Sequence, residues 1–234
     1  MNRLVYFAVP GRAEACRVAL AMSGLEWEDV EIDGQKFAEM RENGELPWGM
    51  VPVLQTDKGT LAESSAILRY LGKLCGLVPE DNFQAAKVDE FLDGMGPLAR
   101  ALDTTFGISD LEERTTLRRA LFEEGGDGAR NLKILDDKIA ESATGWAAGT
   151  EDMSIADLKL FTELFALFSG NYDGIEVPVI QRYENLLQYH AKVANDSRIK
   201  NHYGNISKDD IRWTFLPDAF SDQMVEDLAI YQEI

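Results

Sequence analysis

A proline inside a strand-like run is the feature that most constrains the fold of this chain. Residues 51–54 read Val-Pro-Val-Leu, an apolar run that predicts a short strand, and Asp57-Lys58-Gly59 predicts a turn before a second brief strand at residues 60–61. Pro52 has no N–H group to donate to a neighbouring strand, so its position indicates a turn, with a cis peptide bond as one way to make it.

An amphipathic helix is predicted directly after this hairpin. Glu63, Ser64 and Ser65 open it, and apolar residues follow at three- and four-residue spacings. The N-terminus of a helix presents unpaired N–H groups that attract carboxylates, and Glu63 adds a negative charge beside them. Together they would hold the carboxylate and the ammonium group of one amino acid. In the alternative interpretation, Ser64 is an N-cap and Glu63 an ordinary acidic residue of the first turn.

The order of these motifs resembles the glutathione site of the cytosolic glutathione transferases. The resemblance rests on residues 52–54, Pro-Val-Leu, and residues 63–71, Glu-Ser-Ser-Ala-Ile-Leu-Arg-Tyr-Leu. It implies that the peptide bond before Pro52 is cis and that Glu63 and Ser64 bind the γ-glutamyl end of glutathione.

A second set of residues, near the N-terminus, extends the resemblance. Tyr6 lies toward the end of residues 3–8, which predict a first strand, and Gly-Arg-Ala-Glu follows at residues 11–14. In the tyrosine-type transferases, most closely the sigma class, a tyrosine so placed donates a hydrogen bond to the glutathione sulfur, and the arginine, here Arg12, supports it. A thiol has a pKa of about 8.5, and lowering it by about two units takes about 2.7 kcal/mol, much of which one preorganised donor supplies. In the alternative interpretation, Tyr6 is only a core aromatic residue.

Further glutathione contacts are assigned by the resemblance alone. Phe37 and Arg41 stand where sigma-class proteins have a tryptophan and a lysine against the glycine end of glutathione, although Phe37 lacks the indole N–H donor. Arg41 keeps the cation and is predicted to pair with the glycine carboxylate. Met50 and Val51 precede Pro52, and the backbone of Val51 is predicted to bind the cysteinyl part of glutathione.

The resemblance also predicts a homodimer. Trp48 occupies the loop where several classes have an aromatic residue that enters the second domain of the partner subunit; the alternative is that it folds onto its own loop. Sigma-like dimers also extend an aspartate into the partner's glutathione site. Gly96 or Pro97 stands at that position here, so either Asp93, about one turn away, replaces the aspartate or the contact is absent.

The order of predicted elements indicates two domains. A strand, a helix, a strand, the hairpin and a closing helix predict an α/β thioredoxin-like, glutathione-binding domain over residues 1–76. A linker at residues 77–84 precedes an all-α helical-bundle domain over residues 85–203, and residues 204–234 form a C-terminal extension. The other predicted features are strands at 3–8 and 27–32, helices at 12–23, 111–124, 155–168 and 180–193, an apolar stripe from Val88 to Phe106, breaks near Pro97 and residues 125–128, and a capping box at Ser154 and Asp157.

The C-terminal extension contains an apolar cluster at residues 211–217 that must be buried against another surface. Trp213 or Phe215 is predicted to line or cover the site of the electrophile. The alternative is a brace packed on the outside of the helical domain. A last helix is also predicted, with one side formed by Met224, Leu228 and Tyr231.

Composition excludes several classes of protein. A formal net charge of −18 over 234 residues argues against nucleic acid and anionic membrane surfaces as partners, and no apolar run approaches the roughly 20 residues that span a bilayer. Cys16 and Cys75 have no metal or redox spacing, which favours a reduced, cytoplasmic setting; Cys16 lies a turn into the first helix, where a core position is expected. No metal and no other cofactor are predicted, with glutathione as a co-substrate.

The sequence therefore predicts a tyrosine-type, sigma-like glutathione transferase that conjugates the glutathione thiolate to small hydrophobic electrophiles. Two alternatives remain open. One is a glutathione-dependent isomerase, such as a prostaglandin synthase, which uses the same site. The other is a non-catalytic protein of the same fold that binds ligands or is similar to a lens crystallin. Intact Tyr6, Arg12, Glu63 and Ser64 favour an enzyme.

Overall fold

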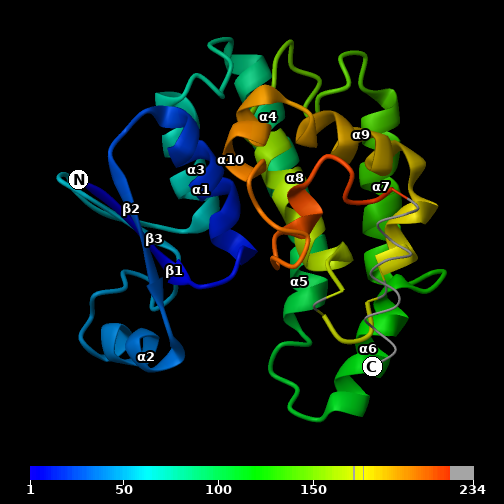
Figure 1. The fold of residues 1–234 in the computed structure, drawn as a ribbon, viewed down its shortest axis with the longest axis horizontal. Helices are drawn as coiled ribbons and strands as arrows, with labels where there is room; N and C mark the ends of the chain where they lie inside the picture. Colours follow the sequence, from blue (N-terminus) through cyan, green and yellow to red (C-terminus); the bar gives the residue numbers. More distant parts are fainter. Residues whose placement is uncertain (171, 176, 222–234) are drawn as a thin grey trace.

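The computed structural model describes residues 1–170, 172–175 and 177–221. Figure 1 shows a four-stranded sheet with its helices at one side of the molecule and a bundle of helices at the other. The α/β element order predicted for the first part of the chain is confirmed, and one further helix, α2, is present. In chain order this part contains β1 Asn2–Phe7, η1 Gly11–Ala13, α1 Glu14–Ser23, β2 Trp27–Ile32, α2 Gly34–Glu42, β3 Val53–Thr56, β4 Gly59–Ala62 and α3 Ser64–Leu74.

The pairing of the strands brings three chain segments to one end of the sheet. The strands lie in the order β2-β1-β3-β4, with β1 parallel to β2 and antiparallel to β3, and β3 antiparallel to β4. Val53 of β3 lies opposite both Val5 of β1 and Ala62 of β4. The ends of β1 and β4 and the start of β3 are therefore neighbours, at what we call the site end of the sheet.

The first helix connects the two parts of the molecule. Gly24 ends α1 in the left-handed conformation, with φ 67°, which a residue with a Cβ atom rarely adopts. The buried face of α1 packs against α3 and against α8 of the helical part. Cys16 lies on this face and is fully buried, which confirms its predicted core position, and burial raises the pKa of its thiol to about 12.

The second part of the molecule is helical, as predicted. A break near Pro97 is confirmed, since α4 ends at Gly94 and the proline stands in the first turn of α5. In chain order this part contains α4 Asn82–Gly94, α5 Gly96–Asp103, α6 Leu111–Phe122, α7 Asp127–Glu141, α8 Ile155–Phe168, η2 Val177–Arg182, α9 Glu184–Ala194, α10 Ser197–Tyr203 and η3 Trp213–Phe215.

The central helix of this part is α8, which contacts α1, α3, α4 and α9. The predicted capping box at its start is confirmed. The Asp157 carboxylate accepts hydrogen bonds from the backbone N–H groups of Ser154 at 2.8 Å and Ala147 at 2.7 Å, and from the Tyr189 hydroxyl at 2.8 Å. Burial raises the pKa of the Asp157 carboxyl despite these bonds. The carboxylate thus joins the start of α8 to α9 and to the loop before it.

Two predicted helical features are wrong. The single helix predicted over residues 180–193 is instead η2 followed by α9, because Tyr183 leaves the helical conformation, with φ −119° and ψ 77°. The buried Tyr183 ring lies against α7, where its hydroxyl donates a hydrogen bond to the Ala129 carbonyl at 3.3 Å. Phe106 does not continue the buried stripe, because α5 ends at Asp103 and the Phe106 side chain is 53% exposed.

Two further predictions, the domain boundaries and the last helix, are not tested by the described elements. The domain boundaries drawn between α3 and α4 stay a prediction. The last helix predicted around Met224, Leu228 and Tyr231 lies outside the described residues. Across the part of the chain that the structure describes, no helix is both long enough and apolar enough to cross a membrane.

Candidate active site

Tyr6 reaches the site end of the sheet from β1 and is largely buried. Its hydroxyl accepts a hydrogen bond from the backbone N–H of Arg12 at 3.2 Å. Gly11, with φ 44°, lets the chain pass close to this hydroxyl, because a Cβ atom at position 11 would lie 2.8 Å from it. A hydroxyl that accepts a hydrogen bond still has its own proton to donate, so Tyr6 is equipped to bind an anion or a thiolate.

A cavity of about 100 Å³ lies beside Tyr6, between the two parts of the molecule. Its walls combine apolar side chains of α5 and α8 with charged and hydroxyl-bearing groups, which suits a small, mostly apolar molecule with a polar substituent. Besides Tyr6, the cavity is lined by Gly11, Arg12, Ala99, Leu102, Asp103, Phe106, Thr162, Glu163, Phe165 and Tyr172.

Arg12 contacts Tyr6 through its backbone and reaches the helical part through its side chain. The guanidinium forms an ion pair with the Asp103 carboxylate of α5, and both side chains are between a third and a half exposed. The hydrogen bond to Asp103 raises the pKa of the Arg12 guanidinium. The sequence reasoning missed Asp103, and no local signal points to it, because the two residues are far apart along the chain.

Glu63 has an unusual backbone conformation at the start of α3. Its φ is 67° and its ψ 111°, and no other non-glycine residue of the described chain has a positive φ. Such strain costs on the order of 1–3 kcal/mol and occurs preferentially at binding sites. The N-cap of α3 is Glu63, without a side-chain capping bond, so the alternative interpretation of Ser64 as the N-cap is wrong. The Ser64 carbonyl accepts a hydrogen bond from the Cys16 thiol at 3.5 Å, which ties this turn to α1.

The peptide bond between Val51 and Pro52 is cis, as the resemblance implies. Both residues are buried at the site end of the sheet. The strand predicted over residues 51–54 begins only at Val53 and extends to Thr56, because Pro52 has no N–H group to pair with β1.

Phe37 and Arg41 lie on α2, close to the residue that follows Tyr6. The Phe37 ring meets the Phe7 ring edge-on at 5.6 Å between centroids, and the Arg41 guanidinium lies 5.3 Å from the centre of the Phe37 ring. The sequence analysis did not predict helix α2. Asp33 caps its start, and Met40 is its one buried residue.

Two large apolar side chains of the loop between α2 and β3 are exposed to solvent. The side chains of Trp48 and Met50 are 73% and 54% exposed. The alternative in which Trp48 folds onto its own loop is therefore wrong.

Asp93 pairs within its own chain, with Arg69 at 2.7 Å, and its side chain is 74% exposed.

Trp213 and Phe215 lie behind the cavity, not in its wall. The Trp213 indole N–H donates a hydrogen bond to the Ser169 carbonyl at 3.3 Å. The Phe215 ring stacks on Phe165, which does line the cavity, at 5.7 Å between centroids. Neither residue is among those that line the cavity, because η3 packs on the side of α8. That either of them lines or covers the electrophile site stays a prediction. This arrangement agrees with the brace.

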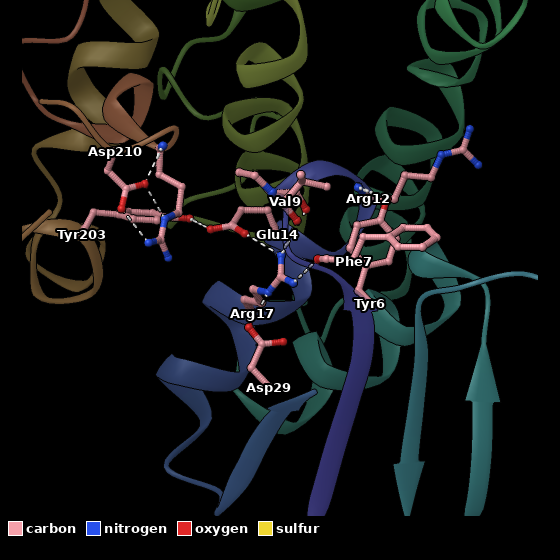
Figure 2. Close-up of polar contacts among 11 residues, drawn as sticks. Tyr6, Phe7, Val9, Arg12, Glu14, Arg17, Asp29, Tyr203 and Asp210 are labelled. Atoms are coloured by element: carbon pink, nitrogen blue, oxygen red, sulfur yellow. Dashed lines mark hydrogen bonds and ion pairs between the residues drawn. The ribbon is translucent and has the colours of Figure 1, made fainter. Parts of the chain in front are cut away.

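A cluster of charged residues around the buried Arg17 lies next to Tyr6 (Figure 2). Arg17 of α1 pairs with Glu14 at 3.0 Å and with Asp29 of β2 at 2.7 Å. Burial disfavours the charged form of Arg17, but these two carboxylates outweigh it and raise the pKa of the guanidinium. Tyr203 of α10 donates a hydrogen bond to Glu14 at 2.7 Å. The sequence reasoning missed this cluster; its available signal was a pair of opposite charges three residues apart in an otherwise apolar helix.

Comparison with known proteins gives one consistent answer. The family model described as the N-terminal domain of glutathione S-transferase matches residues 2–73. Glutathione S-transferase 3 of Caenorhabditis elegans is 35% identical over 201 residues, which cover 85% of this chain and 93% of that protein. Prostaglandin synthase D of Nilaparvata lugens has a similar structure, with a TM-score of 0.77 at 24% identity over 88% of this chain and 98% of the other.

A further solved structure bears on assembly. A glutathione S-transferase of the hookworm Necator americanus, described as monomeric, has a TM-score of 0.69 at 22% identity over 89% of this chain and 99% of the other. The family model and these likenesses confirm the predicted fold class, an α/β thioredoxin-like domain followed by an all-α helical-bundle domain.

Proposed function

Because the chain belongs to the glutathione S-transferase family, we propose that it conjugates the thiolate of glutathione to small hydrophobic electrophiles. The observation that carries this proposal is the position of the Tyr6 hydroxyl, on the wall of the cavity and next to the N–H of Arg12. A sulfur at this position receives a hydrogen bond from the phenol, which stabilises the thiolate over the thiol. The thiol proton leaves to water, and the sulfur forms a C–S bond with an electrophile held in the cavity. The electrophile either releases its leaving group, such as the halide of an aryl halide, or, if it is an activated double bond, takes up a proton from water.

Glutathione, the co-substrate, binds along the site end of the sheet. The N–H groups at the start of α3, with Ser64, hold the γ-glutamyl carboxylate, and Glu63 holds its ammonium group. The strained backbone of Glu63 supports this assignment. The backbone of Val51 binds the cysteinyl part. Arg41, whose guanidinium lies over Phe37, binds the glycine carboxylate.

The class and location of the enzyme follow from the same features. The pair Tyr6 and Arg12 supports a tyrosine-type, sigma-like enzyme. Conjugation to glutathione makes a reactive apolar compound more polar and less reactive, so detoxification is the role that fits. The thiols of Cys16 and Cys75 are free, in agreement with a cytoplasmic location.

Two measurements test the proposal. Calorimetric titration with glutathione is expected to give one binding site per chain, and a chromogenic aryl halide is expected to be conjugated at a rate that depends on the enzyme. Lack of binding would reject the assignment altogether. Binding without conjugation would favour the non-catalytic alternative, and turnover of a prostaglandin endoperoxide without conjugation would favour the isomerase.

A homodimer is the second part of the proposal, and it rests on the exposed Trp48. In the helical part, α4, α5 and α7 surround a groove of about 390 Å³ with an apolar floor that includes Phe91, Met95 and Leu98. We propose that the Trp48 ring of one copy enters this groove of a second copy, since a large apolar ring is stabilised by leaving water.

Sedimentation tests the dimer. Trp48→Ala is expected to raise the dimer dissociation constant by at least about 30-fold, which corresponds to about 2 kcal/mol for a buried aromatic anchor. The matched control is Leu111→Ala, another exposed apolar residue, 58% exposed at the start of α6, which is expected to leave the dimer unchanged. A monomeric wild type, as in the hookworm relative, would reject this part of the proposal.

A further inference from the structure

The buried Arg17 binds the chain segment that follows Tyr6. Its guanidinium donates hydrogen bonds to the backbone carbonyls of Phe7 at 3.2 Å, Val9 at 2.9 Å and Pro10 at 3.2 Å. Figure 2 shows these bonds fanning out from one side chain to the loop between β1 and η1. This loop carries the chain from Tyr6 to the Arg12 N–H group that contacts the Tyr6 hydroxyl.

Arg17 also contacts Tyr6 itself and is fixed from two further elements. Its guanidinium carbon lies 5.8 Å from the centre of the Tyr6 ring. The Asp29 carboxylate accepts from Nε at 2.7 Å, and the Glu14 carboxylate accepts at 3.0 Å from Nη1, the nitrogen that also faces the Val9 and Pro10 carbonyls. A planar guanidinium with five donors is the one side chain that can span three carbonyls and two carboxylates at once.

The net charge of this cluster does not explain a role in supporting Tyr6. One guanidinium and two carboxylates leave a net negative charge, and the neighbouring Arg212 and Asp210 cancel each other in an ion pair at 2.7 Å. A net negative charge beside Tyr6 would disfavour a thiolate bound there. The cluster therefore acts on Tyr6 through position.

The cluster extends into the C-terminal part of the chain. Tyr203, at the end of α10, donates to Glu14 at 2.7 Å, and both side chains are almost completely buried. The Tyr203 ring stacks on Phe215 at 4.6 Å between centroids, and Phe215 in turn stacks on Phe165 in the cavity wall. The segment that was predicted to cover the cavity is thus linked to Tyr6 through Tyr203, Glu14 and Arg17.

We infer that Arg17 is a positioning residue for Tyr6, fixed through Glu14 by Tyr203, so that the C-terminal part of the chain holds the hydroxyl where it meets the glutathione sulfur. This inference rests on the proposed function. Without the guanidinium, the carbonyls of the loop lose their shared donor, the Arg12 N–H moves with the loop, and the Tyr6 hydroxyl loses its alignment with the sulfur.

The test uses the full chain and two substitutions of Arg17. Arg17→Met keeps the length and apolar stem of the side chain but removes every donor. It is expected to raise the apparent pKa of bound glutathione, read from the pH profile of kcat/KM, by about one unit, and to lower kcat/KM about tenfold below that pKa. The Kd for glutathione is expected to stay within about threefold. Arg17→Lys, whose single nitrogen cannot reach all the acceptors, is expected to fall between Arg17→Met and the wild type.

The matched control is Arg3→Met, which removes an exposed arginine of β1 paired with Glu28. It is expected to leave the pH profile unchanged. If Arg17→Met lowers the melting temperature while its pH profile matches that of the wild type, Arg17 is only structural and the inference fails. If Arg17→Met does not fold, Tyr203→Phe tests the inference instead, because it removes only the hydrogen bond to Glu14. Tyr203→Phe is expected to shift the pH profile in the same direction by a smaller amount. An unshifted profile overturns the inference.

A failure of the proposed function has a different signature. A wild type that shows no titrating thiol and no conjugation would count against the transferase assignment, whatever Arg17 does. The position of Tyr6 is then read from its ring resonances in isotope-labelled protein. Arg17→Met is expected to shift these resonances and Arg3→Met is not; unshifted resonances in Arg17→Met would end the inference on their own.

Discussion

Two arginines of one short segment contact Tyr6, and their side chains lie in opposite surroundings. The Arg12 side chain faces the cavity, is 49% exposed and has one ion pair, with Asp103. The Arg17 side chain is 8% exposed and binds two carboxylates and three carbonyls. An exposed ion pair contributes about 0–1 kcal/mol to folding, whereas removing one partner of a buried pair costs about 3–5 kcal/mol. Changes on the cavity side therefore cost little stability, and changes on the buried side cost much.

This difference separates the residues that meet ligands from those that hold them in place. Glu63, Arg41 and Arg12 present charges at or near the surface, where glutathione and an electrophile can reach them. Glu14, Arg17 and Tyr203 are withdrawn from water and satisfy one another. We expect mutations on the exposed side to alter binding and rate with intact folding, and those on the buried side to affect position and stability together.

Among the residues proposed to meet the ligands, the largest effect is expected from Tyr6→Phe. The ring and its contact with Phe7 are retained, and only the hydroxyl that meets the sulfur is removed. Loss of one preorganised donor is expected to lower kcat for conjugation by about 10²-fold, while the Kd for glutathione, measured by calorimetry, stays within about threefold. An unchanged rate, with the thiolate still forming at neutral pH, would mean that another group activates the sulfur and that Tyr6 is only a core residue.

A smaller effect is expected from Glu63→Ala, which removes the charge at the start of α3. Loss of a charged hydrogen-bond partner costs about 1.5–3 kcal/mol, so the Kd for glutathione is expected to rise by about 10- to 150-fold. The value of kcat at saturating glutathione is expected to stay within about threefold, since Glu63 binds the end of the tripeptide and not the sulfur. The control Glu80→Ala removes an exposed acid beyond the end of α3. If the wild type and Glu63→Ala bind glutathione with equal affinity, the strained backbone of Glu63 has no role in binding.

The comparison also explains which features the sequence could predict. Two predictions that rest on strong local signals hold. Pro52 indicated the cis peptide bond, and the capping box of Ser154 and Asp157 fixed the first residue of α8. Tyr6 and Glu63 were proposed as site residues because they belong to short motifs at ends of strands and helices. These features depend on neighbours within a few residues, which the sequence displays directly.

Features that depend on distant partners could not be predicted. The ion pair of Arg12 with Asp103 and the hydrogen bond from Tyr203 to Glu14 join residues from opposite parts of the chain. Residues 213–216 of the cluster predicted at 211–217 are buried, whereas Ile211 is exposed. The sequence could not say that η3 packs on α8, next to Phe165, and not in the wall of the cavity. Hydrophobicity indicates that a segment is buried but not which surface covers it.

The smallest expected effect tests whether the two sides of Tyr6 differ as described. Asp103→Asn removes the partner of Arg12 while keeping the size of the side chain. Because the pair is substantially exposed, the free energy of unfolding, measured with urea, is expected to change by less than about 1 kcal/mol. The uncompensated guanidinium is expected to raise kcat/KM slightly at about pH 6.5, below the pKa of a free thiol, because a positive charge near the site favours the thiolate. Screening by water is expected to limit the effect to about twofold, or about 0.4 kcal/mol. Glu28→Gln, which breaks the similarly exposed pair with Arg3, is the control: it is expected to have the same small effect on stability and none on rate. A loss of stability above about 3 kcal/mol in Asp103→Asn would put the Arg12 pair in the range of a buried one, and the distinction between a ligand-facing and a supporting side would no longer hold.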